Sequence, residues 1–148
     1  MNTHILGIDP GKTNGLVRCS AMGNLVSASD YTSDELYDQL LLWAHNSEVW
    51  VMEKFVPRPF VHVDHTPLEV CAVVRSLARR LSVPLREYLP SDHKMLKTRY
   101  PLRGGSAHMK DAYSLVQYHI FRLRAATSSA ATRSKRSPLP DVVADRTS

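Results

Sequence analysis

Cysteine is scarce in this sequence, and long apolar runs are absent. Its 148 residues include two cysteines, Cys19 and Cys71, which have no CxxC spacing and follow no signal peptide. We therefore expect reduced thiols in a cytoplasmic protein and no disulfide framework. No apolar run approaches the roughly 20 residues that span a bilayer, so we expect a soluble protein without a membrane partner.

A zinc-like ligand spacing and an internal repeat are also absent. Four potential ligands in the middle of the chain match no standard zinc pattern, and we interpret them as surface-loop residues: His62, Asp64, His65 and His93. Without disulfides or structural zinc, stability must come from a hydrophobic core. A chain of 148 residues is long enough to bury roughly two thirds of its unfolded surface, and we expect one folded domain.

Acidic residues are rare between residues 75 and 110. In this block nine Lys or Arg residues oppose two acids, a local charge of +7 in a chain whose formal net charge is +5. Such a block attracts polyanions through salt-dependent contacts. A solvated helix face with a soluble surface is the alternative interpretation.

The hydrophobic pattern predicts an α/β domain over residues 1–123. Apolar runs predict five strands, at residues 5–8, 14–19, 25–29, 48–55 and 84–88. Helical spacing predicts four helices, at residues 33–46, 66–82, 92–99 and 107–123. The strand, helix, strand order across residues 48–88 favours parallel pairing, so the sheet should be mixed and flanked by helices. Residues 124–148 lack periodicity and are predicted to form a basic, disordered tail.

Three acidic residues occupy positions that a plain fold does not need. Asp9 ends the first strand, Glu53 ends the apolar strand at 48–55, and Asp111 follows His108 by three residues on the last helix. Asp9 can also be read as a turn residue, and Glu53 as the first exposed residue after its strand.

If the first and fourth strands are neighbours, these acids converge at one edge of the sheet. Carboxylates that meet in this way repel one another unless a divalent cation lies between them. Two Mg²⁺ or Mn²⁺ ions roughly 4 Å apart polarise a phosphodiester and activate water. The acids therefore suggest phosphodiester hydrolysis.

Three motifs carry a resemblance to a known family. In order, ILGIDPGKTNG, VWVMEKF and HMKDA resemble the RuvC-type Holliday junction resolvases of the ribonuclease H-like superfamily, especially the short bacteriophage members. The resemblance covers about residues 3–123. It implies a ribonuclease H-like fold with a five-stranded mixed sheet, two Mg²⁺ ions per active site with Mn²⁺ as a substitute, and cleavage of four-way DNA junctions. It also implies a homodimer that pairs through residues 66–81, in the cytoplasm of a bacterial or phage-infected bacterial cell.

The resemblance also assigns roles to individual residues. Asp9, Glu53 and Asp111 match the family's metal ligands, and His108 lies where a second-metal ligand or proton carrier is found. Lys94 matches a lysine near the scissile phosphate, with Lys97 as an equally reachable alternative. The DNA-binding surface is expected to draw on the basic block and on one aromatic residue that can stack on a base or pack in the fold: Arg75, Arg79, Arg80, Lys97, Arg99, Arg103, Lys110 and Phe55.

Other functions remain compatible with the motifs. The pattern from Asp9 to Gly15 also resembles the phosphate loop of sugar kinases and actin-like ATPases, which need two copies of this fold. A ribosomal-RNA-processing nuclease of the same superfamily would carry similar acids. A catalytically silent nucleic-acid-binding module would keep the basic block and use the acids as turn and cap residues.

Overall fold

The part of the chain that the structure describes forms five strands and four α-helices in an α/β arrangement. The computed structural model describes residues 3–59 and 64–134. Its elements follow the predicted order, with a short 3-10 turn at Ala44–Asn46: β1 (His4–Asp9), β2 (Asn14–Ser20), β3 (Leu25–Tyr31), α1 (Ser33–Trp43), β4 (Ser47–Glu53), α2 (Thr66–Arg80), β5 (Leu85–Tyr88), α3 (Pro90–Arg99) and α4 (Ala107–Ser134).

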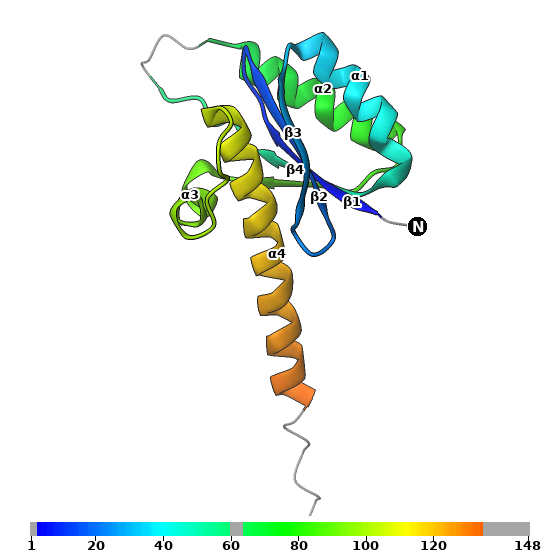
Figure 1. The fold of residues 1–148 in the computed structure, drawn as a ribbon. Coiled ribbons are helices and arrows are strands. Elements are labelled where there is room, and N and C mark those ends of the chain that lie inside the picture. The colour runs from blue at the N-terminus through cyan, green and yellow to red at the C-terminus, as the bar shows by residue number, and fades with distance from the viewer. Residues whose placement is uncertain (1–2, 60–63, 135–148) are drawn as a thin grey trace, which may run out of the picture.

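The five strands form one mixed sheet in the order β3-β2-β1-β4-β5 (Figure 1). The first three strands are an antiparallel meander, whereas β4 pairs in parallel with both β1 and β5. The parallel pairing predicted from the strand, helix, strand order is therefore confirmed. Because β1 and β4 are neighbours, the ends that carry Asp9 and Glu53 meet at the same edge of the sheet.

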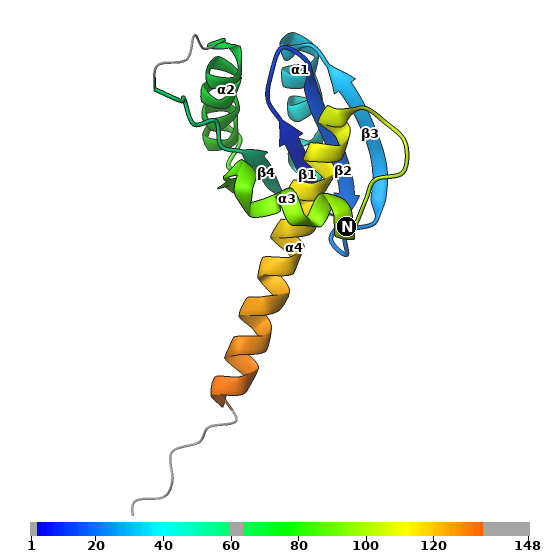
Figure 2. The same ribbon diagram turned by 90° about the vertical axis from the view of Figure 1, so that its left-hand side faces the viewer.

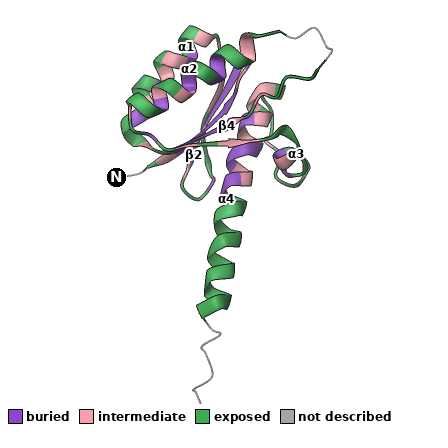
Figure 3. Ribbon diagram, turned by 180° about the vertical axis from the view of Figure 1, so that it is seen from behind, coloured by how far each residue is buried: buried purple, intermediate pink, exposed green. Residues whose placement is uncertain are grey.

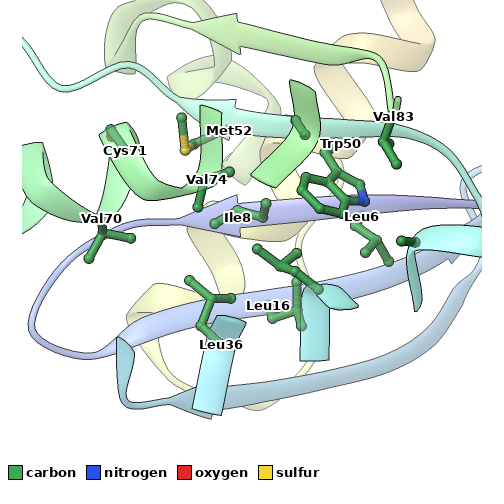
Figure 4. Packing of buried hydrophobic residues seen from close by; sticks show 13 residues of the cluster. Leu6, Ile8, Leu16, Leu36, Trp50, Met52, Val70, Cys71, Val74 and Val83 are labelled. Atoms are coloured by element: carbon green, nitrogen blue, oxygen red, sulfur yellow. The ribbon is translucent and has the colours of Figure 1, made fainter. Parts of the chain in front are cut away.

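Helices cover both faces of the sheet. On one face, α1 and α2 pack over Leu6, Ile8, Trp50 and Met52 (Figures 1, 2 and 4). On the other face, the first half of α4 packs over a second apolar cluster, which includes Ile5, Val17, Val49 and Val51.

The alternation of side chains along β1 and β4 also orients the two acids. Ile5 and Val51 point toward α4, and successive side chains of a strand point to opposite faces. Asp9 therefore continues the α4-facing set of β1, and Glu53 continues that of β4. Both acids lie on the side of the sheet that α4 covers.

Two glycines let α4 approach the sheet closely. A Cβ on Gly15 of β2 would overlap the backbone carbonyl of His108, and a Cβ on Gly7 of β1 would overlap that of Ala112. The start of α4 therefore rests directly on the backbone of the two strands. This contact brings His108 to the end of β1.

The predicted end of the last helix is wrong. Instead of ending at residue 123, α4 continues to Ser134, so residues 124–134 are helical rather than disordered. This segment contains no Pro or Gly, and its four alanines are strong helix formers: Ala125, Ala126, Ala130 and Ala131. Its lack of an apolar period reflects exposure on all sides (Figure 3). The remainder of the predicted tail, residues 135–148, lies outside the described residues.

Both cysteines are buried and unpaired, which confirms the prediction of free thiols. Burial raises the pKa of the Cys19 thiol to about 12. Among the described helices, none combines the length and apolarity that crossing a membrane requires.

Candidate active site

Asp9 and His108 come together across 99 residues of sequence. The Nδ1 atom of His108 lies 3.0 Å from Oδ2 of Asp9. The Asp9 side chain is only 9% exposed, whereas that of His108 is 44% exposed. The structure thus brings together the first-strand acid and the helix histidine that the sequence singled out.

Burial raises the pKa of Asp9 to about 7, and the hydrogen bond with His108 opposes this rise. The negative charges of Asp111 and Glu53 raise the pKa further. Asp111 and Glu53 are therefore close enough to disfavour the ionisation of Asp9. A divalent cation among them would offset both the burial and the repulsion, and carboxylate oxygens are the ligands that Mg²⁺ and Mn²⁺ prefer.

Glu53 is held by a histidine that the sequence analysis misjudged. Oε2 of Glu53 lies 2.7 Å from Nε2 of His93, and Nδ1 of His93 lies 2.6 Å from Oγ of Ser114. His93 is buried on the inner face of α3, so its interpretation as a surface-loop residue is wrong. Asp64 and His65 do precede α2 as exposed residues, whereas His62 lies outside the described residues.

Asp111 forms an ion pair with Lys97 of α3. Each of the three acids therefore faces one basic side chain: His108 for Asp9, His93 for Glu53 and Lys97 for Asp111. Of the two lysines proposed to lie near the phosphate, Lys97 contacts an acid, while Lys94 lines the hollow in front of the acids.

An open hollow of about 710 Å³ lies in front of Glu53 and Asp111. Its wall carries four Lys and Arg side chains, from the segment after β4 and from α3: Lys54, Arg58, Lys94 and Lys97. Such a wall attracts an anionic ligand toward the acids. Sequence reasoning did not select Lys54 and Arg58, although both follow Glu53 within five residues and could have been found by that proximity.

The predicted metal ligands are not assembled as a metal site. Within residues 3–59 and 64–134, no three His, Cys, Asp or Glu side chains form a group that could hold a metal ion. Each acid is instead paired with a basic side chain. Binding a cation would therefore require at least Lys97 to leave Asp111.

The predicted DNA-binding residues do not form one group. Arg75 forms a bidentate ion pair with Glu87, with contacts of 2.6 to 3.1 Å. Arg79 and Arg80 end α2, which runs from the carboxyl end of β4 back toward the start of β5. None of these three arginines lines the hollow in front of Glu53 and Asp111.

Other members of the predicted set lie nearer to the site. Lys97 and Lys110 line a smaller hollow of about 260 Å³ beside the start of α4. Arg99 lies over the ring of Tyr100 at 5.7 Å, and Arg103 is exposed in the loop that precedes α4. Phe55 packs partly against the core under α1 and α2 and also lines the large hollow.

The mixed five-stranded sheet with helices on both faces has the ribonuclease H-like fold, as the sequence predicted. Within this class, the chain is similar to RuvC of Thermus thermophilus in complex with a Holliday junction substrate. The TM-score is 0.69 at 18% identity, over 84% of this chain and 97% of that chain. A second structure of Thermus thermophilus RuvC gives a TM-score of 0.61 at 15% identity, over 84% of this chain and 98% of that chain.

The predicted resemblance to RuvC is thus confirmed at the level of the fold. No protein-family model matches the sequence, and no curated protein matches it. At identities of 18% and 15% the likeness concerns the fold alone, so the activity must be argued from the site.

Proposed function

We propose that this chain is a metal-dependent endonuclease that resolves four-way DNA junctions by paired phosphodiester hydrolysis. The observation that carries the proposal is that Glu53 and Asp111 line a hollow with a basic wall and lie near enough to Asp9 to act on its charge, in a RuvC-like fold. The basic wall would attract the anionic phosphodiester backbone, and hard cations at the acids would bind its phosphate.

Asp9, Glu53 and Asp111 are the residues that would hold the cations. Two Mg²⁺ ions, or Mn²⁺ in their place, would polarise the scissile phosphate and activate water. His108 approaches Asp9 from α4 and is partly exposed, so it can hold a second ion or move a proton. Lys97 can turn from Asp111 to the incoming phosphate once a cation neutralises that carboxylate, and Lys94 can do so from the hollow wall.

Branched DNA is the partner that the fold favours, because one of the similar structures is RuvC in complex with a Holliday junction substrate. On this chain, the basic residues near the acids would contact the backbone, and Phe55 would offer a ring at the edge of the hollow. We expect Arg75 to contribute less than the other basic residues, since Glu87 already neutralises its charge.

Paired nicks require two active sites, and a homodimer would supply them. The outer face of α2, which is the expected dimer interface, exposes the apolar residues Leu68 and Val73, which are 39% and 36% accessible. Their burial against a second α2 would favour association.

The proposal is tested by incubating the protein with an end-labelled four-way junction in Mg²⁺, in Mn²⁺ and in chelator, beside linear duplex of the same arms. We expect paired nicks in opposing strands that require metal and are absent from duplex. Asp9→Asn should still bind the junction but lose cleavage. The exposed acid Asp38 on α1 provides a matched control, since Asp38→Asn should cleave as the wild type does.

Other outcomes point to the alternatives. Junctions that are bound but left intact in every metal would indicate a catalytically silent binding module, and full cleavage by Asp9→Asn would remove the proposed site. Preferential cutting of structured RNA would favour an RNA-processing nuclease. Tight ATP binding without DNA affinity would favour the actin-like alternative.

A further inference from the structure

His93 occupies an unusual position in the wall of the hollow. Its side chain is 3% exposed, yet both ring nitrogens have partners: Glu53 at 2.7 Å and Ser114 at 2.6 Å. A buried imidazole is costly unless its nitrogens are hydrogen-bonded. Here one of those partners is a candidate metal ligand.

The ring connects the elements that carry two of the acids. Glu53 ends β4, His93 lies on α3, and Ser114 lies on α4 one turn after Asp111. The Ser114 hydroxyl in turn donates to the backbone carbonyl of Asp111 at 2.8 Å. Contacts of hydrogen-bond length thus link the Glu53 carboxylate, through His93 and Ser114, to the backbone of Asp111.

Packing alone does not explain this arrangement. Leu96, one turn after His93, is an apolar side chain that packs on the inner face of α3. An apolar residue at position 93 and an alanine at position 114 would fill similar space without desolvating polar groups. The buried polar pair is explained if its hydrogen bonds serve to hold Glu53 in one orientation.

We propose that His93 is a positioning residue for Glu53, an inference that rests on the proposed function. An ionised carboxylate can only accept, so Nε2 carries the hydrogen that reaches Oε2, while Ser114 orients the ring through Nδ1. Among the described residues no hydrogen bond reaches Oε1 of Glu53. His93 thereby holds one carboxylate oxygen and leaves the other to a cation.

The test compares His93→Leu with His93→Gln. Leucine removes the donor at similar volume, whereas the glutamine amide keeps a donor within reach of Glu53. Mn²⁺ binding is measured by titration calorimetry without DNA, junction affinity is measured in chelator, and the unfolding midpoint is measured in chelator. Loss of a hydrogen bond to a ligating group costs about 10- to 100-fold in metal affinity, and we expect a loss of this size for His93→Leu.

His93→Gln should recover most of the Mn²⁺ affinity, and all variants should bind the junction in chelator as the wild type does. The matched control is His119, a buried histidine of α4 whose Nδ1 lies 2.8 Å from the Tyr88 hydroxyl and which does not line the hollow. His119→Leu should leave Mn²⁺ affinity unchanged, whatever it does to the unfolding midpoint.

The outcomes separate three possibilities. Folded His93→Leu protein that binds Mn²⁺ as tightly as the wild type overturns the positioning role. A lowered unfolding midpoint with unchanged Mn²⁺ affinity, as expected for His119→Leu, would make His93 merely structural. If the wild type itself neither binds Mn²⁺ nor cuts junctions, the proposed function fails first and this inference falls with it.

If His93→Leu does not fold, His93→Gln and Ser114→Ala decide the question. Ser114→Ala frees the ring to turn but keeps the donor, so Mn²⁺ affinity should fall several-fold, less than the loss expected for His93→Leu. Unchanged Mn²⁺ affinity in both folded variants overturns the proposal.

Discussion

The two faces of the sheet are filled in different ways. The cluster between the sheet and the α1/α2 layer consists of apolar side chains and one thiol, Cys71 (Figure 4). On the α4 face, apolar residues are joined by buried polar groups of α3 and α4: His93, Ser114 and His119. The first face supplies burial and hence stability. The second also has to hold a helix end and two acids in place.

The two faces should therefore differ in how they tolerate substitutions. A defect in the α1/α2 face away from Phe55 should cost stability alone, because the side chains of the three acids do not pack there. A defect in the α4 face should displace the candidate site even where stability survives.

A substitution at the contact between Gly7 and α4 should cause the largest loss of junction cleavage. In Gly7→Ala, the new Cβ would overlap the carbonyl of Ala112 and come within 2.8 Å of Cγ2 of Val116. The helix must move outward, which separates His108 from Asp9. Since a shift of about 1 Å can cost on the order of 100-fold in rate, we expect junction cleavage to fall by at least about that factor.

The matched change on the other face is Val74→Ala in α2, a fully buried position. The cavity should cost about 2 kcal/mol in free energy of unfolding, measured by urea titration, with cleavage near the wild-type rate below the unfolding transition. Overpacking at Gly7 should cost about 1 to 3 kcal/mol. Equal losses of cleavage in both variants would contradict the division between the two faces.

Asp9→Asn should stabilise the metal-free protein. The pKa of Asp9 is raised from 3.8 to about 7 in the folded state, so the folded protein keeps a proton that the unfolded chain has lost. Folding stability from this group therefore falls as the pH rises from about 4 to 7, and it stays lost above that pH. Asparagine removes this cost, by an amount on the order of 2 to 4 kcal/mol at pH 8.

The measurement is urea unfolding of both proteins in chelator at pH 5 and pH 8. The stability gain of Asp9→Asn should be larger at pH 8 than at pH 5. Added Mn²⁺ should stabilise the wild type and not the variant. A variant that is less stable than the wild type at pH 8 would show that Asp9 is ionised at little cost.

Much of the fold follows from local patterns in the sequence. Continuous apolar runs such as that ending at Glu53 predict buried parallel strands, and the spacing to β5 requires a crossover. The acids could be recognised because Asp9 and Glu53 interrupt those runs at strand ends. The alternation of the strands explains why both face α4.

The partners of these acids could not be predicted in the same way. The local sequence does not distinguish a buried histidine such as His93 from an exposed one, because its burial depends on the packing of α3 against α4. The choice between Lys94 and Lys97 depends on the rotation of α3, which its weak apolar pattern does not define. The helical extension of α4 was missed because an exposed helix needs no apolar period, only residues that favour it.

The buried His119 of α4 should lower the free energy of unfolding in acid. Burial, followed by the charge of Arg86, lowers the pKa of His119 from 6.5, while Glu48 has the opposite effect. The neutral ring is favoured in the fold, so its stability contribution is present above pH 6.5 and is lost as the pH falls through the lower folded value. His119→Gln should flatten the decline in unfolding free energy between pH 7.5 and pH 5, measured in chelator. If this decline is the same in His119→Gln as in the wild type, other titrating groups cause it.

Removal of the second half of α4 should have the smallest effect on stability. We propose residues 1–123 as the folding unit, because every residue from 124 to 134 is exposed. Truncation after Leu123 should change the free energy of unfolding by less than about 0.5 kcal/mol. It removes five basic and two acidic residues, so junction affinity should fall modestly and depend less steeply on salt. Both are measured by urea unfolding and by junction binding across salt concentrations. A loss of several kcal/mol would mean that this exposed helix packs against a second chain, and the contrast between the faces would then have to include that interface.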